Sequence, residues 1–543
     1  MPNARFQVPR PQNEPNLSYA PGSPERSAQK AKLAELRSRE IEIPVVIGGE
    51  EVHTGRVAEV RLPHRHGQVI ARVHLAGAAE VARAVEAALS ARREWSALEW
   101  PERASVFLKA AELLAGPWRA VLNAATMLGQ SKTVFQAEID SACEIIDFWR
   151  FNVAFAEALY EGQPLSPAGV WNRLEYRPLE GFVFAVTPFN FTSIAANLPT
   201  APAILGNAVL WKPASSAVYS GYHVLRLLEA AGLPPGVVNF LPGPGSAVGD
   251  PILQSPHLAG LHFTGSNATF EGMWRTIAEN LGRYRAYPRI VGETGGKDFV
   301  FAHASADVEA LATALVRGAF EYQGQKCSAA SRAYVPQSLW PAVKERLVER
   351  TAALRMGDVE DFRNFMGAVI DRAAFDRISG YLALARGSSE TRVLVGGEAD
   401  PSQGWFVEPT VVETQNPRSR LMEEEIFGPV LTVFPYPDAR LEEALRICDE
   451  TSPYGLTGAV FARDRRAIAR IAKELENAAG NLYLNDKPTG AVVGQQPFGG
   501  ARKSGTNDKA GSAANLMRWI SPRAVKETFV PPTRVEYPHQ GEP

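Results

Sequence analysis

The chain has 543 residues, of which 45% are apolar and 21% charged, and its formal net charge is -2. This length exceeds what a single hydrophobic core supports, so we expect two or more domains. The small net charge and the lack of a long basic run argue against nucleic acid or an anionic membrane as a partner. No apolar run is long enough to cross a bilayer, so no membrane-spanning segment is predicted.

The cysteine and histidine content indicates neither a disulfide framework nor a metal site. Only three cysteines occur, Cys143, Cys327 and Cys448, which is typical of a reducing compartment. We therefore expect a cytoplasmic protein. The alternative is the mitochondrial matrix, since residues 1–22 weakly resemble a transit peptide. The stretch His64-Arg65-His66 is predicted to be a solvated loop, and no metal is expected.

In chain order, residues 1–40 are predicted to form an N-terminal arm that ends in a helix. Ser23-Pro24-Glu25 supplies an N-cap, a proline at the first helical position and an acid near the helix dipole. A strand-like region and then a largely helical region, to about residue 160, follow. In residues 137–154 apolar side chains recur every three or four positions, which places Cys143 in the core. Glu144 then faces away from that stripe or into a cavity beside it.

From residue 174 onward, short β-prone runs alternate with segments of helical length, and a second such series covers residues 308–485. This alternation predicts βαβ units, and hence two tandem α/β domains with open parallel sheets. We expect residues 41–160 and 179–292 to form one domain and 293–485 the other. The short strand-like segments 161–178 and 515–535 would leave unpaired edges, which predicts a β-flap for oligomerisation in a homodimer or larger assembly.

Three motifs follow predicted strands at the sheet edge where α/β proteins bind ligands. In the first, the Asn190 side-chain amide could stabilise an oxyanion, or it could cap a helix that begins at Thr192. In the second, Lys212 could reach a ribose or a phosphate, or be an ordinary solvated lysine. In the third, Gly265 and Ser266 open a helix whose free N–H groups suit a pyrophosphate.

A single cysteine, Cys327, stands among small polar residues directly after a lysine. A nearby cation would favour the thiolate of a nucleophile, although a small buried cysteine is the alternative. Glu293 lies 34 residues upstream, just before two glycines. It is either a base that activates water or a loop acid paired with Lys297.

Two later stretches complete the candidate site. Glu425 could accept from ribose hydroxyls while Phe427 packs on a flat cofactor, or the acidic run could be a solvated face. Residues 486–514 form a glycine-rich loop in which the N–H groups of Gly490 and Ala491 could hold a carboxylate. The alternative for this loop is a plain surface turn.

Taken together and in this order, these motifs resemble the aldehyde dehydrogenase superfamily over roughly residues 40–530. The motifs are TPFNF at 187–191, Lys212-Pro213, FTGS at 263–266, ETGGK at 293–297, GQKC at 324–327, EEIFGP at 424–429 and PFGG at 497–500. The stretches 22–26, 137–140, 320–328, 493–502 and 504–508 are most similar to the branch that oxidises glutamate γ-semialdehyde in proline degradation.

The resemblance implies a function and assigns roles to residues. The expected reaction converts L-glutamate γ-semialdehyde to L-glutamate with NAD, through a thiohemiacetal and a thioester on Cys327. Asn190 would hold the oxyanion and Glu293 would activate water. The residues implied to bind NAD are Thr187, Lys212, Ser215, Gly265, Ser266, Glu425 and Phe427. Those implied to bind the substrate are Ser328, Gly490 and Ala491 at its α-carboxylate, and Phe191 and Phe498 around its aliphatic part.

Two departures from the family pattern affect these expectations. Many relatives that prefer NAD carry a glutamate where this chain has Ser215, which predicts that NADP is tolerated beside NAD. Some members have a serine where this chain has Ala491, which predicts a lower affinity for the carboxylate here.

Three other functions remain open from the residues. One is an NAD(P)-dependent dehydrogenase for another short aldehyde. A second is a cysteine hydrolase or acyltransferase without redox chemistry, although no histidine stands near Cys327 in the sequence. The third is a non-catalytic relative of the family. All the expected reactive positions are filled, which argues against this possibility.

Overall fold

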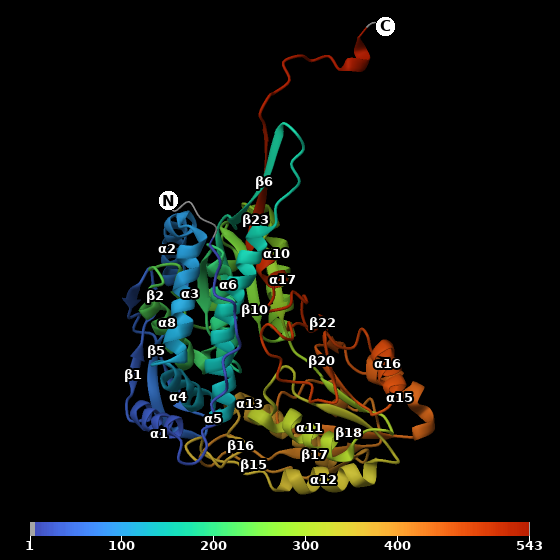
Figure 1. Cartoon of the computed structure of the whole chain (residues 1–543). Helices are drawn as coiled ribbons and strands as arrows, with labels where there is room; N and C mark the ends of the chain where they lie inside the picture. Colours follow the sequence, from blue (N-terminus) through green and yellow to red (C-terminus); the bar gives the residue numbers. More distant parts are fainter. Residues whose placement is uncertain (1–5, 542–543) are drawn as a thin grey trace.

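Two seven-stranded sheets organise residues 6–541, the part of the chain that this computed structural model describes (Figure 1). The first sheet has the strand order β11-β10-β7-β8-β9-β2-β3. Strands β7 to β11 run parallel, whereas β2 pairs antiparallel with β9 and with β3. The bounds are β2 (Val45–Ile47), β3 (Glu50–Val52), β7 (Phe182–Val186), β8 (Ala208–Lys212), β9 (Val238–Phe240), β10 (Leu258–Thr264) and β11 (Arg289–Glu293).

Helices cover both faces of this sheet, because successive side chains of a strand point to opposite faces. In β7, Phe182 and Phe184 belong to the core beneath one helical layer, while Val183 and Ala185 belong to the core on the other side. Helices α2 (Ala78–Ala97), α9 (Gly245–Leu253) and α10 (Asn267–Glu279) pack on the first face. The other face carries α3 (Trp100–Ala115), α4 (Arg119–Gln130), α6 (Ile145–Glu161), α7 (Thr192–Ile204) and α8 (Val218–Ala231).

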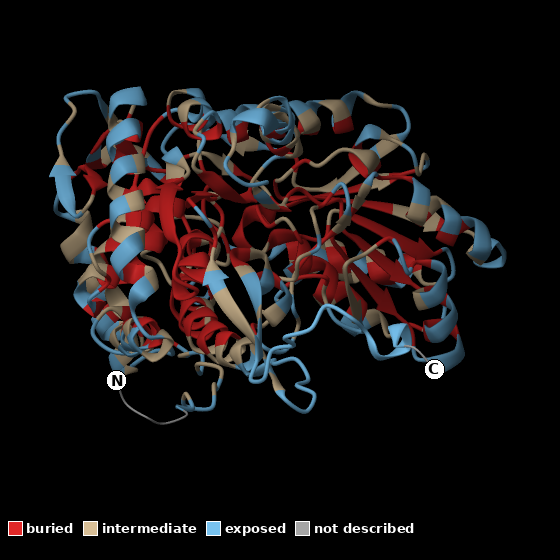
Figure 2. Cartoon of the chain, turned by 90° about the horizontal axis from the view of Figure 1, so that it is seen from above, coloured by how far each residue is buried: buried red, intermediate tan, exposed pale blue. Residues whose placement is uncertain are grey.

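The second sheet has the order β14-β17-β18-β13-β12-β20-β21 and is parallel except for the edge strand β14. Its strands are β12 (Phe299–Ala302), β13 (Arg332–Pro336), β14 (Thr391–Val395), β17 (Thr410–Thr414), β18 (Val430–Tyr436), β20 (Thr457–Phe461) and β21 (Asn481–Leu484). The helices around it are α11 (Val308–Phe320), α12 (Trp340–Ala352), α13 (Arg372–Gly387), α15 (Leu441–Glu450) and α16 (Arg465–Glu474). Figure 2 shows the buried residues gathered along the strands, with exposed residues on the outer sides of the helices.

The predicted α/β class is confirmed, but the sheets are mixed, since each ends in antiparallel strands. A separate three-stranded sheet is formed by β1 (Ile41–Ile43), β4 (Val57–Leu62) and β5 (Arg65–His74). Short elements complete the chain: α5 (Val134–Ala137), α14 (Arg420–Glu423), α17 (Ala513–Leu516), and the pairs β15 (Ala399–Asp400) with β16 (Phe406–Val407) and β19 (Tyr454–Gly455) with β22 (Ala501–Arg502).

The N-terminal region is an extended arm followed by α1 (Pro24–Arg37). The Ser23 hydroxyl accepts from the Arg26 N–H at 3.3 Å, so the predicted N-cap is confirmed. The arm runs along the helical layer that contains α3 and α6 (Figure 1).

A two-stranded ribbon projects from the body of the molecule (Figure 1). It consists of β6 (Val170–Pro178) and β23 (Ile520–Thr528), which pair antiparallel along their whole lengths. Beyond β23 the chain extends away from the body. None of the helices in residues 6–541 is long and apolar enough to cross a membrane.

The predicted helix over residues 137–154 contains an irregularity that the periodicity does not indicate. Residues Glu138–Glu144 form a π-helix between α5 and α6. Cys143 is buried, as predicted. Glu144 lines a cavity, which decides between the two orientations expected for it.

Candidate active site

The motifs predicted at strand ends meet at one edge of the first sheet. The β7–β8 register pairs Val186 with Lys212, and the β10–β11 register pairs Thr264 with Glu293. Strand β8 lies on one side of β7 and β10 on the other, so the strand order reverses direction at β7. Crevices at such reversal points, at the carboxyl ends of the strands, are where α/β sheets bind ligands.

The polar groups at this edge have spare hydrogen-bonding capacity. Lys212 is buried, and its Nζ donates to the Pro213 carbonyl at 3.2 Å, its one hydrogen bond to the described residues. Burial lowers its pKa, so the alternative of a solvated lysine is wrong. Ser266 caps α10 by accepting from the Thr269 N–H at 3.3 Å, and Gly265 precedes it. Thr187 accepts from the Trp211 indole at 2.9 Å, while Ser215 lies exposed beside Lys212 in sequence.

Glu293 is the last residue of β11, and the loop after it leads into β12 of the second sheet. The loops that carry Cys327 and Glu425 end where β13 and β18 begin. Gly296 lies against the Cys327 loop, and a Cβ placed on it would come within 2.3 Å of the Cys327 carbonyl oxygen. Its N–H donates to Glu425 Oε1 at 2.8 Å. Phe427 has a positive φ of 53° and packs edge-on against Phe189.

Strained backbone precedes the cysteine. Tyr322, Gln323 and Gly324 have φ values of 50°, 56° and 64°, a left-handed conformation that non-glycine residues rarely adopt. Such strain persists where the surroundings enforce it. Here the Gln323 amide donates to two carbonyls, those of Ser131 at 3.1 Å and Ala368 at 2.6 Å.

The electrostatic surroundings of Cys327 differ from the expectation. Lys326 forms an ion pair with Glu321 at 3.0 Å. Burial raises the pKa of the Cys327 thiol well above its usual range, and the carboxyl groups of Asp298, Glu293 and Glu425 raise it further. The adjacent Lys326, paired with Glu321, is not among the groups that lower this pKa, so the expectation that it favours the thiolate is not supported.

The Asn190 amide is directed at the cysteine loop, since its Nδ2 donates to the Gln325 carbonyl at 3.1 Å. The helix cap that was its alternative role is filled by Asp140 instead. The Asp140 carboxylate accepts from the N–H groups of Thr192 and Ser193, at 3.0 and 2.8 Å, and pairs with the buried Lys132 at 2.6 Å.

A cavity of about 430 Å³ lies between the helical layer, the cysteine loop and residues 486–514. Its lining brings together two of the three predicted catalytic residues, Cys327 and Glu293. All five predicted substrate residues also line it: Phe191, Ser328, Gly490, Ala491 and Phe498. Asn190 and the predicted cofactor residues Thr187, Lys212, Ser215, Gly265, Ser266, Glu425 and Phe427 lie outside this lining.

The far end of the cavity can hold an anion. Gly490 has a positive φ of 96°, and within residues 6–541 neither its N–H nor that of Ala491 has an acceptor. The Ser328 hydroxyl lies 2.8 Å from the Thr489 hydroxyl. Gly490, Ala491, Ser328 and Thr489 all line the cavity, and the carboxylate site expected from the loop sequence stays a prediction.

Two buried acids face the same cavity. Glu293 accepts from the Gly500 N–H at 3.2 Å and makes no ion pair with Lys297, which donates to Ser331 instead. Burial raises the Glu293 pKa well above its usual value, although Gly500 and Lys509 oppose the shift. A carboxyl group whose pKa is raised is a stronger base when ionised, which suits it to accept a proton from water. Burial and the nearby Asp140 raise the Glu144 pKa to about 8.

One histidine cluster has metal-like spacing that the sequence does not indicate. Ligand atoms of Glu42, His53 and His74 lie within 4.8 Å of one another. The Gly55 N–H donates to His74 Nδ1, so the ring proton resides on Nε2 and is directed at Glu42. Both ring nitrogens of His74 therefore have hydrogen-bond partners within the protein. His64, predicted to lie in a solvated loop, is buried against Ser131 and Asp358.

The chain is similar to known proteins over nearly its whole length. The family model described as the aldehyde dehydrogenase family matches residues 51–525. A delta-1-pyrroline-5-carboxylate dehydrogenase of Dictyostelium discoideum is 53% identical, covering 99% of this chain and 97% of its own. The human protein of that name is 51% identical, covering 96% and 92% respectively. The crystal structure of the Mycobacterium tuberculosis delta-pyrroline-5-carboxylate dehydrogenase bound with NAD has a TM-score of 0.96 at 55% identity, covering 99% of this chain and 100% of that one.

Proposed function

The chain belongs to the aldehyde dehydrogenase family, and from this premise we propose that it oxidises L-glutamate γ-semialdehyde to L-glutamate with NAD. The semialdehyde arises by ring opening of delta-1-pyrroline-5-carboxylate, the compound after which the relatives are named. The reaction is a step of proline degradation. The observation that carries the proposal is one cavity lined by a cysteine, a partly buried acid and two residues whose backbone N–H groups have no acceptor within residues 6–541.

The edge of the first sheet fits a dinucleotide. The spare donors of Lys212 suit ribose hydroxyls, and the N-terminus of α10 at Gly265 and Ser266 suits a pyrophosphate. Glu425 is placed to accept from the second ribose, beside Phe427, and Thr187 follows β7 next to Lys212, to whose carbonyl its N–H donates at 3.2 Å. NAD, when bound, supplies the hydride acceptor.

Cys327 performs the covalent chemistry. After the thiol has lost its proton, Sγ adds to the aldehyde carbon and forms a thiohemiacetal. The Asn190 amide has a second N–H besides the one bound to Gln325, and the Cys327 backbone N–H has no carbonyl acceptor within residues 6–541. These two donors stabilise the developing oxyanion. Loss of hydride leaves a thioester, and water deprotonated by Glu293 releases the acid and frees the sulfur.

The substrate's α-carboxylate is held by the N–H groups of Gly490 and Ala491 and by the Ser328 hydroxyl. Phe191 and Phe498 enclose the methylene groups between carboxylate and aldehyde. Because a short aldehyde without a carboxylate leaves those donors unpaired, it should be a poorer substrate.

The test is NADH formation with pyrroline-5-carboxylate, compared with propanal, butanal and pentanal. We expect kcat/KM for pyrroline-5-carboxylate to exceed that for each simple aldehyde by at least about tenfold, since two or three hydrogen bonds are at stake. Cys327→Ala should abolish activity with all of them. Equal activity with pentanal would instead favour a dehydrogenase for other short aldehydes, and turnover without NADH would favour a hydrolase. The same assay with NADP tests the tolerance that Ser215 predicts.

The compartment and the assembly extend this proposal. The Dictyostelium, bovine and human relatives are named as mitochondrial proteins, which supports the matrix over the cytoplasm for this chain. The β6–β23 ribbon supports a homodimer or a larger homo-oligomer, because an isolated two-stranded sheet is marginally stable in water.

A further inference from the structure

The extended arm, residues 6–20, does not line the substrate cavity. It contacts the loop of residues 486–514, which forms one wall of that cavity. It runs antiparallel to the helix α6 and the π-helix before it. The N–H groups of Val8, Glu14 and Leu17 donate to the carboxylates of Glu157, Asp147 and Glu138, at 3.2, 2.7 and 2.8 Å. The arm is therefore attached at three points along these helices.

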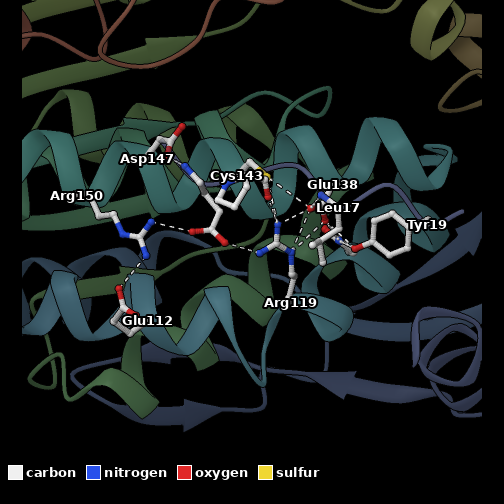
Figure 3. A network of polar contacts seen from close by, with 11 residues as sticks. Leu17, Tyr19, Glu112, Arg119, Glu138, Cys143, Asp147 and Arg150 are labelled. Atoms are coloured by element: carbon white, nitrogen blue, oxygen red, sulfur yellow. Dashed lines mark hydrogen bonds and ion pairs between the residues drawn. The ribbon is translucent and has the colours of Figure 1, made fainter. Parts of the chain in front are cut away.

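Buried ion pairs hold the arm in this position. Glu14 lies between Arg119 and Arg150, at 2.6 and 2.8 Å. Arg119 also pairs with Glu138, which accepts from the Tyr19 hydroxyl at 2.7 Å. Figure 3 shows this network, with Arg119 joined to Glu138, Leu17 and Tyr19 beside Glu138, and Asp147 and Arg150 farther along. Detaching the arm would leave Arg119 without one of its two carboxylate partners, so the network disfavours detachment.

One arm residue, Asn13, connects these helices to the substrate loop. Its Nδ2 donates to Asp147 Oδ2 and to the Val493 carbonyl, both at 2.8 Å. Its Oδ1 accepts from the Gln495 amide at 2.9 Å. All three polar bonds of this side chain thus join α6 to the loop that contains Gly490 and Ala491.

The loop at this point has little freedom of its own. Val493 is buried and lines the cavity two residues after Ala491. Gly494 has a positive φ of 80°, and a Cβ there would come within 2.2 Å of the Phe151 ring on α6. Since the loop rests directly on α6 and is joined to it through Asn13, a change at Asn13 should be transmitted to the neighbouring N–H groups.

We propose that Asn13 is a positioning residue that sets the carboxylate-binding N–H groups of Gly490 and Ala491, and thereby the preference for a substrate that carries an α-carboxylate. This inference rests on the proposed function. It predicts an effect on carboxylate recognition that leaves the cysteine chemistry intact, because Asn13 contacts neither Cys327 nor Glu293.

The test compares Asn13→Ala with Asn16→Ala in the full-length protein. Asn16 lies exposed on the same arm, and within residues 6–541 its side chain makes no hydrogen bond, so it is a matched control. For Asn13→Ala we expect KM for pyrroline-5-carboxylate to rise about fivefold, with kcat changed less than twofold and kcat/KM for pentanal unchanged. The dissociation constant for L-glutamate should rise by a similar factor. Asn16→Ala should match the wild type in all four quantities.

An unchanged KM and an unchanged glutamate affinity in Asn13→Ala would overturn the inference. So would an equal loss with pyrroline-5-carboxylate and pentanal, since that pattern indicates a general structural role. A wild-type protein that does not oxidise pyrroline-5-carboxylate would overturn the proposed function itself, which separates the two failures. If Asn13→Ala is poorly folded, Gln495→Ala removes one of the same bonds from the loop side and should shift KM in the same direction.

Discussion

Single residues around the cavity carry acid groups whose pKa values are shifted upward by burial. Glu293 and Glu144 share the cavity with the Cys327 thiol, and all three favour their protonated forms more than in water. Burial disfavours the charged form of each group. Ionising one of them therefore affects the reaction, where the group acts as a base, and the free energy of unfolding. The consequences at Glu293 and Glu144 can be separated by mutation.

Glu293→Gln should stop the reaction after the redox step. The amide cannot deprotonate water, so the thioester on Cys327 should accumulate and steady-state turnover should fall by about 100-fold or more. Rapid mixing with NAD and substrate should then show a burst of NADH of about one equivalent per active site. Steady-state turnover at the wild-type rate would contradict the role of Glu293, and Cys327→Ala, which should show no burst, is the control.

Glu144→Gln should change how stability depends on pH. The Glu144 pKa is raised to about 8, so its favourable contribution is complete below the ordinary carboxyl pKa and is lost as pH rises toward 8. The glutamine variant lacks this loss. We expect its free energy of unfolding, relative to the wild type, to increase by at least about 1 kcal/mol between pH 5 and pH 8.5. Urea unfolding at both pH values measures this, and a parallel pH dependence of the two proteins would contradict it.

At the scale of elements, the start of α7 depends on a side chain from another helix. Asp140, in the π-helix, caps α7 directly after Asn190 and Phe191 and neutralises the buried Lys132. A single carboxylate therefore fixes a helix end, a buried charge and the segment that carries two site residues.

Asp140→Ala should destabilise the protein by about 3 kcal/mol or more, because it leaves Lys132 buried without its partner and removes the cap. It should also lower kcat, since Asn190 is adjacent to the loosened helix end. Asp376→Ala, which removes an exposed acid paired with Arg372 on α13, should cost less than about 0.5 kcal/mol. Urea unfolding and steady-state kinetics measure both variants, and equal effects would contradict the argument.

The order of elements and the strand-end motifs could be predicted from the sequence, because strands and helices alternate with clear local periodicity. The elements that position Asn190 could not be predicted from the sequence. The Asp140 cap lies about 50 residues upstream of α7, and the π-helix has the same apolar spacing as an ordinary helix. The pairing of Lys326 with Glu321 also depends on the strained turn between them, which the sequence does not indicate. The expectation that Lys326 favours the Cys327 thiolate did not take this pairing into account.

At the scale of the whole molecule, the β6–β23 ribbon projects from the body of its own chain (Figure 1). Its residues are mostly half-buried or exposed, and the exposed side chains of Trp171 and Phe529 lie at its far end. A ribbon of this kind needs a partner surface for stability.

We therefore expect a sedimentation mass of at least twice the 59.0 kDa of one chain. On dilution to the monomer, amide hydrogens of β6 and β23 should exchange at least about tenfold faster, while those of the central strand β7 keep their protection. Hydrogen exchange at high and low protein concentration measures this. A monomeric mass at every concentration, or protection of the ribbon that does not change on dilution, would contradict it.

The π-helix at Glu138–Glu144 has a consequence for the length of the chain. A π-turn accommodates one residue more than an α-turn between the same two ends. A chain shortened by one residue here could continue as regular α-helix with the residues on either side in nearly their present orientation, whereas a deletion within α6 would turn the side chains before it by about 100° relative to those after it. The π-helix is therefore a segment of the pocket wall in which the chain can lose one residue and still keep α5 and α6 aligned, provided that Asp140 and Glu144 are retained.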